Sequence, residues 1–415
     1  MRFDEVFSEE ELIGLLARQR AAAAKSRHDE QFLRNLSRSA KPPSAKGEID
    51  KCFPPRRLWL RSPRTRRQGR SSLNLNAYDL SRTVSTLLRS AEHQNDDWAL
   101  RISHLLAQLR MRGLASAAAT IDSPKVLPKE KGPHTYRAIS NYALNDRVII
   151  GQCAKYLRHC FDSGFLECSY AFRTARPHQN APQHHDAVKA LIAYRKQFSG
   201  KPLWVAECDI RGFFDCVDHE IAKTCFQEGI KRASQQGITV DKRAASIFYS
   251  FLRSYTFSTV AAPQAQEWFN KHDRLGILKW PEEALTKIHA DLNNCVIGIP
   301  QGGAISCLIA NLMLHSADEA VTNEGHSTPS DPDLFYARYC DDMILMHPDR
   351  DRAKCESAFE RYQDRLKKLK LPCHAPITVE KYDATFWDSK SKNPYQWGVI
   401  SCRLRLFGEN ALVER

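Results

Sequence analysis

The 415-residue sequence contains few cysteines and no Cys-x-x-Cys pair. Its 13 cysteines are about 3% of the chain, too sparse for a disulfide-stabilised scaffold. Without closely spaced cysteines a structural zinc site has little support, and a reducing cytosol is the simplest predicted environment. The N-terminus also lacks the apolar core of a secretion signal, because residues 9–11 are all glutamate.

Long apolar runs are missing as well. Residues 292–317 contain no Lys, Arg, Asp or Glu, but Gln301, Asn311 and His315 interrupt them. The apolar part is far shorter than the roughly 20 residues that a membrane-spanning helix needs. The sequence therefore predicts no membrane span there.

Acidic residues are in the minority, since 61 Lys and Arg against 48 Asp and Glu give a net charge of +13. Such an excess is compatible with plain solubility, but it also fits a polyanionic partner, most often nucleic acid. Hydrophobic residues make up 42% of the chain and charged residues 26%, which are the proportions of a soluble protein with a large core. At about 150 residues per domain, two or three globular units are expected.

The N-terminal part combines helices with a basic arm. Residues 8–38 have helical spacing, with Ser8 as the predicted N-cap. Residues 51–70 contain no acid and interleave basic residues with apolar ones such as Trp59. We predict this arm to be partly docked and partly facing phosphate groups, the alternative being a mobile linker. The predicted RNA-binding residues are Arg56, Arg57, Arg61, Arg64, Arg66, Arg67 and Arg70.

Helical spacing resumes over residues 77–113. Two strand-like runs, 125–128 and 136–139, then flank a turn and predict a basic hairpin. A further helix is predicted over residues 145–159.

Three later segments carry chemistry, and the first is VAECDIRGFFDCVDH, residues 205–219. An apolar strand delivers Asp209, and Gly212 allows the chain to turn directly afterwards. A carboxylate held at the end of a rigid strand beside a turn is a good metal ligand. Aspartate at a strand end is also ordinary turn chemistry.

The second segment is GIPQGGAISCLIANLMLHSAD, residues 298–318. Gly302 and Gly303 follow Gln301 and precede a predicted helix, so a ligand has room to approach the backbone closely. The alternative is a helix-entry loop with core packing behind it.

The third segment is LFYARYCDDMILM, residues 334–346. Two strand-like runs flank Asp341 and Asp342 and predict a hairpin with both acids at its apex. An isolated Asp-Asp pair is often only a turn, but adjacent carboxylates between apolar strands repel each other, and a divalent cation relieves that repulsion. With Asp209 they supply the oxygen ligands that Mg²⁺ prefers.

In this order, DIRGFF, PQGGAIS and YCDD resemble motifs A, B and C of reverse transcriptases. Upstream, LPKEKGPHTYRAIS and SYAFR resemble the fingers motifs of the bacterial, group II intron-like branch; downstream, residues 377–382 and NPYQWGV resemble motifs D and E. The resemblance covers residues 124–407. It implies an α+β right-hand polymerase with fingers and palm, a helical N-terminal extension, and no or a minimal thumb.

The implied domains are an N-terminal helical extension with the basic arm (1–95), fingers (96–200), a palm with an insertion at about 234–294 (201–407) and a short tail (408–415). Only eight residues follow Phe407, so no thumb is expected there. The basic arm, a structured RNA or a second protomer is then expected to hold the template and primer.

The resemblance also implies catalytic roles. Asp209, Asp341 and Asp342 are the expected catalytic residues, and together with the backbone of Ile210 they would bind two Mg²⁺ ions, for which Mn²⁺ could substitute. The ions would lie roughly 4 Å apart and support phosphoryl transfer. Cys340 stands where intron-type enzymes usually have Ala and viral ones Met or Val.

Nucleotide contacts follow from the same motifs. Phe214, five residues after Asp209, matches a steric gate against ribonucleotides, and Gln301 is expected to touch the incoming nucleotide and template. Lys381 is the candidate general acid, although motif D is ragged here. The expected nucleotide-binding residues are Lys129 (or Lys131), Arg137, Arg211, Gly212, Phe213, Phe214, Gln301 and Lys381.

Within the family, the chain most resembles the short defence-associated bacterial reverse transcriptases of the unknown groups (type 2-like). This implies a cytoplasmic RNA-directed DNA polymerase that copies a dedicated structured non-coding RNA into cDNA from deoxynucleoside triphosphates, in antiviral (anti-phage) defence. No membrane partner is expected, and oligomerisation stays open.

Three alternatives remain. One is template-independent or protein-primed DNA synthesis in abortive-infection defence. Another is a retron- or intron-type reverse transcriptase, although the C-terminal part lacks the Val-Thr-Gly of retrons. The third is a polymerase fold kept only for RNA binding, which the intact acids argue against.

Overall fold

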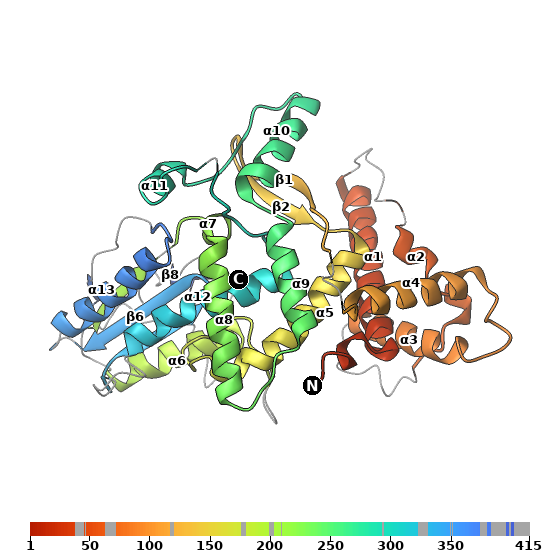
Figure 1. The fold of residues 1–415 in the computed structure, drawn as a ribbon, viewed down its shortest axis with the longest axis horizontal. Coiled ribbons are helices and arrows are strands. Elements are labelled where there is room, and N and C mark those ends of the chain that lie inside the picture. The colour runs from red at the N-terminus through yellow and green to blue at the C-terminus, as the bar shows by residue number, and fades with distance from the viewer. Residues whose placement is uncertain are drawn as a thin grey trace. The chain divides into compact units, whose positions relative to one another are not determined.

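The computed structural model describes residues 1–37, 45, 47–62, 72–116, 120–175, 180–198, 203–208, 210–292, 294–322, 331–348, 350, 352–373, 380–382, 396–397 and 400–401. The chain divides into two compact units (Figure 1), of which unit 1 comprises Met1–Ala119 and Arg147–Tyr156 and unit 2 comprises Thr120–Asp146 and Leu157–Arg415. The predicted domain boundaries at 95, 200 and 407 stay predictions, and the predicted tail lies outside the described residues.

The elements of unit 1 are all helical. They are η1 (Glu5–Phe7), α1 (Glu9–Ser37), α2 (Glu48–Lys51), η2 (Arg56–Leu58), α3 (Ser72–Leu87) and α4 (Asp97–Gly113), with the middle of α5 (Leu144–Phe161). The predicted helix over 8–38 is confirmed as α1, whose start Ser8 caps by accepting the backbone N–H of Glu11 (N to Oγ 3.4 Å). The helical spacing predicted over 77–113 is confirmed as two helices, α3 and α4, and the second begins where Asp96 takes an extended conformation as the N-cap of α4.

The core of unit 1 forms where α1 packs against α3. Leu12 and Leu16 of α1 are fully buried, as are Leu80 and Val84 of α3. Because these residues recur at helical spacing, one face of each helix is apolar and removing it from water stabilises the pair.

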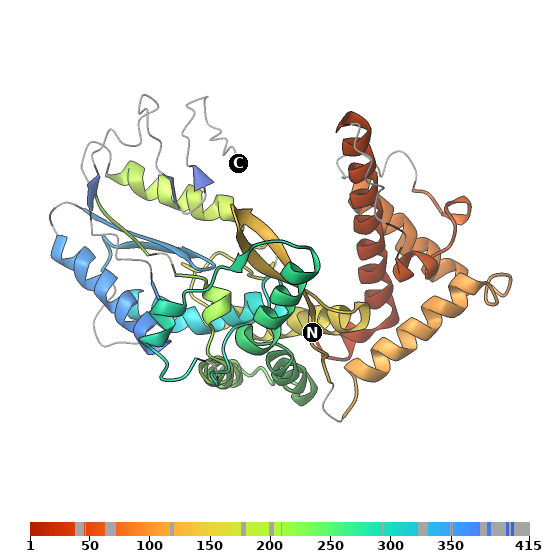
Figure 2. The same ribbon diagram turned by 90° about the horizontal axis from the view of Figure 1, so that it is seen from above.

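Unit 2 is built on a four-stranded antiparallel sheet of order β5-β6-β3-β7. Its strands are β3 (Leu203–Cys208), β5 (Phe335–Tyr339), β6 (Asp342–Pro348) and β7 (Glu380–Tyr382). Helix α6 (His184–Gln197) covers one face, where Leu191 packs with Val205 and Ile344. Helix α13 (Arg352–Lys368) contacts β3 and β6, and Figure 2 shows it on the opposite side of the sheet from α6.

Helix α12 (Ala304–Thr322) packs beside α13 and α8 (His219–Gln235). The four residues predicted for its inner face, Ile305, Leu308, Ile309 and Leu312, are all buried. None of the helices that the structure describes combines the length and apolarity of a bilayer crossing. Helices together with mainly antiparallel sheets agree with the predicted α+β class.

A second, smaller sheet of unit 2 has the order β1-β2-β4. The predicted basic hairpin is confirmed as β1 (Lys125–Gly132) and β2 (Thr135–Asn141), and the helix predicted over 145–159 is confirmed as α5. We call β1–β2 the cationic hairpin. Strand β4 (Ile277–Leu278) joins it in parallel and comes from residues 234–294, here called the A–B segment.

The A–B segment is mostly helical. It contains the end of α8, then α9 (Lys242–Arg253), the π-helix η5 (Phe257–Ala261), α10 (Ala262–Lys271), β4 and α11 (Glu282–Thr286). Helix α10 lies beside β1 and β2 (Figure 1), where Gln264 of α10 accepts the backbone N–H of Val126 (N to Oε1 2.8 Å). The short strands β8 (Gln396–Trp397) and β9 (Ile400–Ser401) pair separately.

Candidate active site

The predicted hairpin of motif C is confirmed as β5 and β6, here called the acid hairpin. Tyr339 pairs with Asp342, so Cys340 and Asp341 form a two-residue turn. Cys340 has a φ of +62°, a left-handed conformation that usually calls for glycine at the first position of such a turn. A non-glycine residue held there costs about 1–3 kcal/mol and persists only where its surroundings fix it.

The end of β3 lies next to the acid hairpin. Cys208 pairs with Met343, the neighbour of Asp342, so the strand that leads to Asp209 reaches the acids. Asp209 itself lies outside the described residues. After it, the backbone of Ile210 bridges to Cys373 and is buried. The residue before Asp209 therefore pairs with the acid hairpin, and the residue after it is fixed to Cys373.

Glu207 is an acid that the sequence interpretation missed. It pairs with Ile344, and strand alternation puts both on the same sheet face as Asp342. Its Oε1 is buried and has no hydrogen-bond partner. Burial, and then the negative charge of Asp342, raise the pKa of Glu207 to about 8. A glutamate two residues before Asp209 in an apolar strand was the available sequence signal.

These acids fit a divalent cation. Glu207 has an orphaned carboxylate oxygen, and Asp342 adds negative charge to the same face. A bound cation would give the Glu207 oxygen a partner and would offset the repulsion between Glu207 and Asp342. Carboxylate oxygens are also the ligands that Mg²⁺ prefers. Outside Asp209, which the description does not include, no cluster of three or more metal-ligating side chains forms among the described residues.

A buried arginine supports the turn of the acid hairpin from within. Arg338 is fully buried in β5, in a strand otherwise rich in apolar and aromatic residues. Its guanidinium donates to both carboxylate oxygens of Asp318 (2.7 Å each), Asn311 Oδ1 (3.2 Å), Ser169 Oγ (2.9 Å) and the carbonyl oxygen of Cys340 (2.8 Å). Arg338 thus connects α12 with the strained residue beside Asp341. The arginine in FYARYC was visible in the sequence, but its partners were not.

Gln301 lies where motifs A and B meet. Its Nε2 donates to Asp215 Oδ2 (2.7 Å), and Asp215 is buried. Burial raises the pKa of Asp215 to about 7, although the hydrogen bond from Gln301 and the positive charge of Arg137 oppose the shift. Motif A, motif B and the cationic hairpin therefore share one electrostatic neighbourhood. Asp215 was not predicted as a site residue.

The cationic hairpin brings two predicted nucleotide ligands together. Lys129 and Arg137 are direct cross-strand partners, and both are exposed. Side chains of directly opposite residues lie about 5 Å apart at Cβ, so the two positive charges repel each other. A polyphosphate would relieve that repulsion. Lys131 lies two residues further along β1, also exposed.

The motif A turn is the predicted triphosphate cradle, and this role stays a prediction. Gly212 has a φ of +58° and is exposed, while Arg211 donates its backbone N–H to the carbonyl oxygen of Pro372 (2.8 Å). Phe213 is buried, and Phe214 is half-buried with its carbonyl oxygen accepting the backbone N–H of Ile299 (2.7 Å). Phe214 is thereby fixed to motif B.

The structure does not bring Lys381 to the acids. Lys381 of β7 pairs with Trp204, five residues before Asp209. At about 3.3 Å per residue this is roughly 16 Å along the strand. The sequence lacked the register that separates them.

The basic arm is docked at its start. Trp59 donates its indole N–H to the carbonyl oxygen of Pro54 (3.1 Å), the backbone N–H of Leu60 donates to Thr83 Oγ1 (2.9 Å), and that of Ser62 to Asp79 Oδ1 (3.1 Å). Three predicted RNA-binding residues on this docked part are exposed: Arg56, Arg57 and Arg61. The others, Arg64, Arg66, Arg67 and Arg70, lie outside the described residues.

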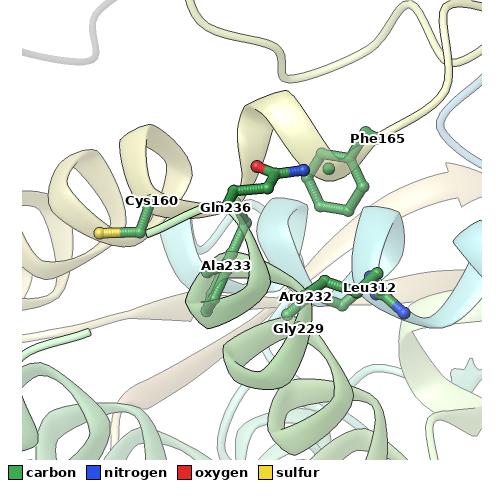
Figure 3. Close-up of a pocket in the computed structure, with 9 residues that line it drawn as sticks. Cys160, Phe165, Gly229, Arg232, Ala233, Gln236 and Leu312 are labelled. Carbon is green, nitrogen blue, oxygen red and sulfur yellow. The ribbon is translucent and has the colours of Figure 1, made fainter. Parts of the chain in front are cut away.

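One pocket of unit 2 lies between α5, α8 and α12 (Figure 3). Phe165, Gly229, Ala233 and Leu312 line it, and Arg232 lies at its side. Its cavity of about 10 Å³ has room for a single water molecule at most. The pocket therefore contributes no ligand site.

A family model for "Reverse transcriptase (RNA-dependent DNA polymerase)" matches residues 127–385. This range holds the acid hairpin, Gln301 and most of the cationic hairpin, and it is more than half of the chain. The chain belongs to the reverse transcriptase family, as motifs A, B and C predict.

Two known proteins are similar to more than half of the chain. The chain is 22% identical over 280 residues to Protein YkfC of Escherichia coli K12, which covers 59% of this chain and 61% of that protein. It is 24% identical over 297 residues to the group II intron-encoded protein LtrA of Lactococcus lactis subsp. cremoris, covering 68% of this chain and 41% of that protein. The chain thus spans less than two thirds of the length of these relatives.

Proposed function

We propose that the chain is an RNA-directed DNA polymerase that makes cDNA by two-metal phosphoryl transfer. The observation that carries this proposal is the acid hairpin, whose Asp341 and Asp342 stand beside the end of β3 and near the orphaned Glu207 carboxylate. A protein that only bound RNA would gain nothing from converging like charges, which are costly without a cation. In this proposal the four-stranded sheet belongs to the palm and the cationic hairpin to the fingers.

Asp209, Asp341, Asp342 and the backbone carbonyl of Ile210 would hold the two Mg²⁺ ions, for which Mn²⁺ is a substitute. When bound, the ions lower the pKa of the primer 3′-hydroxyl and stabilise the charge on the leaving pyrophosphate. The chain would keep these ligands in place, because Arg338 donates to the carbonyl oxygen of Cys340 in the turn that contains Asp341.

The nucleotide would lie between the motif A turn and the cationic hairpin. Lys129 and Arg137 would neutralise the triphosphate, and the backbone around Gly212 would cradle it. Phe214 would exclude a ribose 2′-hydroxyl, since its backbone is fixed to Ile299. Arg211, Phe213 and Gln301 complete the proposed contacts. The register of β7 gives the proposed role of Lys381 no support.

The partner we propose is a structured non-coding RNA that serves as template and scaffold. Residues 1–119 hold 22 Lys and Arg against 13 Asp and Glu, a net +9 out of the +13 of the whole chain. Nucleic-acid binding releases counterions in proportion to the phosphates that such cations contact. The docked arm offers Arg56, Arg57 and Arg61 on its exposed side, and Arg64, Arg66, Arg67 and Arg70 belong to the same proposed surface.

We further propose that this cDNA synthesis serves anti-phage defence in the bacterial cytoplasm. The support is the resemblance of the ordered motifs to short defence-associated reverse transcriptases. The likeness to LtrA favours an intron-type enzyme as the second candidate. Template-independent or protein-primed synthesis is the third, and oligomerisation stays open.

One experiment separates these functions. The purified protein, with the RNA that copurifies, is given labelled deoxynucleotides with and without prior RNase treatment, and the products are sequenced. RNase-sensitive products that map to one short RNA are expected. RNase-resistant products of random or single-base sequence would overturn the templated reaction, and products that map to a self-splicing intron would favour the second candidate.

A further inference from the structure

The A–B segment connects two parts of the proposed nucleotide site, and its first connection is to the cationic hairpin. The backbone N–H of Ile277 donates to the carbonyl oxygen of His134 (3.0 Å), and that of Lys279 to Tyr136 (3.1 Å). Gly276 fits closely here, since a Cβ on it would lie 2.6 Å from the Tyr136 ring and 2.7 Å from the Phe269 ring. The segment is therefore built onto β2 as a third strand.

Two aromatic rings continue from this strand. Trp280 stacks on Phe257, with ring centroids 4.5 Å apart and an interplanar angle of 19°. Both pack in one apolar cluster with Val126 of β1 and Ala138 of β2. Stacked, desolvated rings of this kind contribute specific geometry beyond their buried area. The position of Trp280 is thus set by the cationic hairpin and by Phe257.

The second connection is to motifs A and B. Trp280 Nε1 donates to the backbone carbonyl oxygen of Asp215 (3.1 Å). Phe257 donates its backbone N–H to the carbonyl oxygen of Ile297 (2.9 Å). Gly298 has a φ of +94°, and a Cβ on it would lie 3.0 Å from the Phe257 backbone, so no side chain fits between Phe257 and motif B.

Asp215, whose backbone is bound by Trp280, is in turn hydrogen-bonded to Gln301. Its carboxylate accepts from Gln301 Nε2 (2.7 Å), and that bond decides which way the Gln301 amide points, with its oxygen as the remaining acceptor. The backbone of residues 213–219 also runs beside motif B, with the N–H of Gly298 on the carbonyl oxygen of Val217 (2.8 Å). The indole, Asp215 and Gln301 form one chain of contacts.

We propose that Trp280 is a positioning residue for nucleotide binding, because it fixes Asp215, and through Asp215 the Gln301 amide, relative to the cationic hairpin. The A–B segment thereby fixes Arg137 and Gln301, the two proposed nucleotide contacts, relative to each other. This rests on the proposed function in that Gln301 contacts the incoming nucleotide. The acids lie outside this chain of contacts, so metal binding and the chemical step are not its targets.

The test compares Trp280→Phe, which keeps a ring to stack on Phe257 but removes the indole N–H, with wild type. The expected result is a rise of about three- to tenfold in KM for deoxynucleotides, as one lost hydrogen bond predicts, with kcat and the Mg²⁺ half-saturation unchanged within twofold. Hydrogen exchange at the amides of Gly298 and Ile299 is expected to accelerate. Phe257→Leu, which loosens the same ring, should give a smaller change in the same direction and replaces the first variant if that variant does not fold.

Trp268→Phe is the matched control. Trp268 belongs to α10 of the same segment and packs on Tyr136 and Phe269, away from Asp215. It should leave both KM and exchange at Gly298 and Ile299 at their wild-type values. Unchanged KM and exchange in Trp280→Phe would overturn the proposal, as would a fall in kcat without a change in KM. If the wild type made no cDNA at all, the polymerase function would fail, and hydrogen exchange would still report on the connection between Trp280 and motif B.

Discussion

The acid hairpin and the cationic hairpin of unit 2 carry opposite charges and are supported in different ways. The acid hairpin holds Asp341 and Asp342 at its tip, and a fully buried Arg338 fixes its turn from within. In the cationic hairpin Lys129 and Arg137 are exposed, and strand β2 pairs with β4 of the A–B segment. Metal ligands need positions fixed to a fraction of an ångström, whereas exposed cations act on a polyphosphate over several ångströms.

The largest effect is expected at the acids. Asp341→Ala together with Asp342→Ala removes two proposed metal ligands and should lower polymerisation by roughly a thousandfold or more, because catalytic groups that act as a unit are lost together. Primer extension on a defined RNA template measures it. RNA binding should persist, and its loss in this variant would contradict a purely catalytic role.

Next comes the support of the acid hairpin. Arg338→Met leaves Asp318 buried without its partner and should lower the free energy of unfolding by about 3–5 kcal/mol. Adding Asp318→Leu removes the second charge and should restore part of the stability, as thermal unfolding would measure; the rest stays lost because the Tyr336 hydroxyl, which donates to Asp318 Oδ1 (2.7 Å), then lacks its acceptor. Polymerisation should stay low in the double variant, because the Cys340 carbonyl still lacks its donor. Full activity in a stable double variant would mean that Arg338 only stabilises the fold.

At the cationic hairpin the effect should be on binding. Lys129→Ala with Arg137→Ala is expected to raise KM for deoxynucleotides by roughly tenfold or more, with kcat little changed, since two charge-assisted contacts are lost. Steady-state kinetics at low and high salt would measure it, and the effect should shrink with salt. Lys125→Ala at the start of β1 is the control. An equal rise in KM in that control would mean that the hairpin acts through its overall positive charge and not through contacts of Lys129 and Arg137.

Between the hairpins, Asp215 should couple stability to pH. Its pKa is about 7, above the ordinary value of 3.8, so folding favours the protonated form. Its contribution to stability is full below pH 3.8 and is lost as pH rises to about 7. Asp215→Asn should therefore gain stability relative to wild type between pH 5 and pH 8, on the order of a few kcal/mol. Thermal unfolding of both proteins from pH 5 to pH 8 measures this gain. A stability difference that does not change with pH would mean that the Asp215 carboxyl lies in a more solvated site.

The smallest effect is expected at the arm. Arg56, Arg57 and Arg61 changed together to Ala should weaken RNA binding and lower its salt slope by about 2 to 3, because each of the three lost phosphate contacts contributes roughly 0.7 to 0.9. Arg101→Ala, an exposed arginine paired with Asp97 on α4, is the control. An unchanged slope in the triple variant would remove the docked part of the arm from the RNA interface.

The sequence predicted the two hairpins but not what supports them. Strand-like runs around Asp341 and Asp342, and strand-like runs around a turn in the basic segment, predicted both correctly, because strand pairing across a short turn is a local property. The support of each hairpin was not predictable. Arg338 reaches Asp318 and Ser169 from distant parts of the chain, and β4 reaches β2 across more than a hundred residues.

Similar reasoning explains the individual misses. Glu207 and Asp215 are ordinary acids in the sequence, and only burial beside Asp342 or Gln301 distinguishes them. The A–B segment appeared as an insertion without chemistry, because its indole hydrogen bond to Asp215 depends on folding. The nucleotide role of Lys381, taken from a ragged motif, stays a prediction, and the register of β7 places its backbone opposite Trp204.

The most direct test of the central claim, that the acid hairpin holds catalytic cations, is Mn²⁺ binding measured by electron paramagnetic resonance. The account predicts that wild type binds Mn²⁺ and that Asp341→Asn with Asp342→Asn weakens this binding at least tenfold, while the folded state and RNA binding are retained. Equal Mn²⁺ binding by both proteins would contradict it.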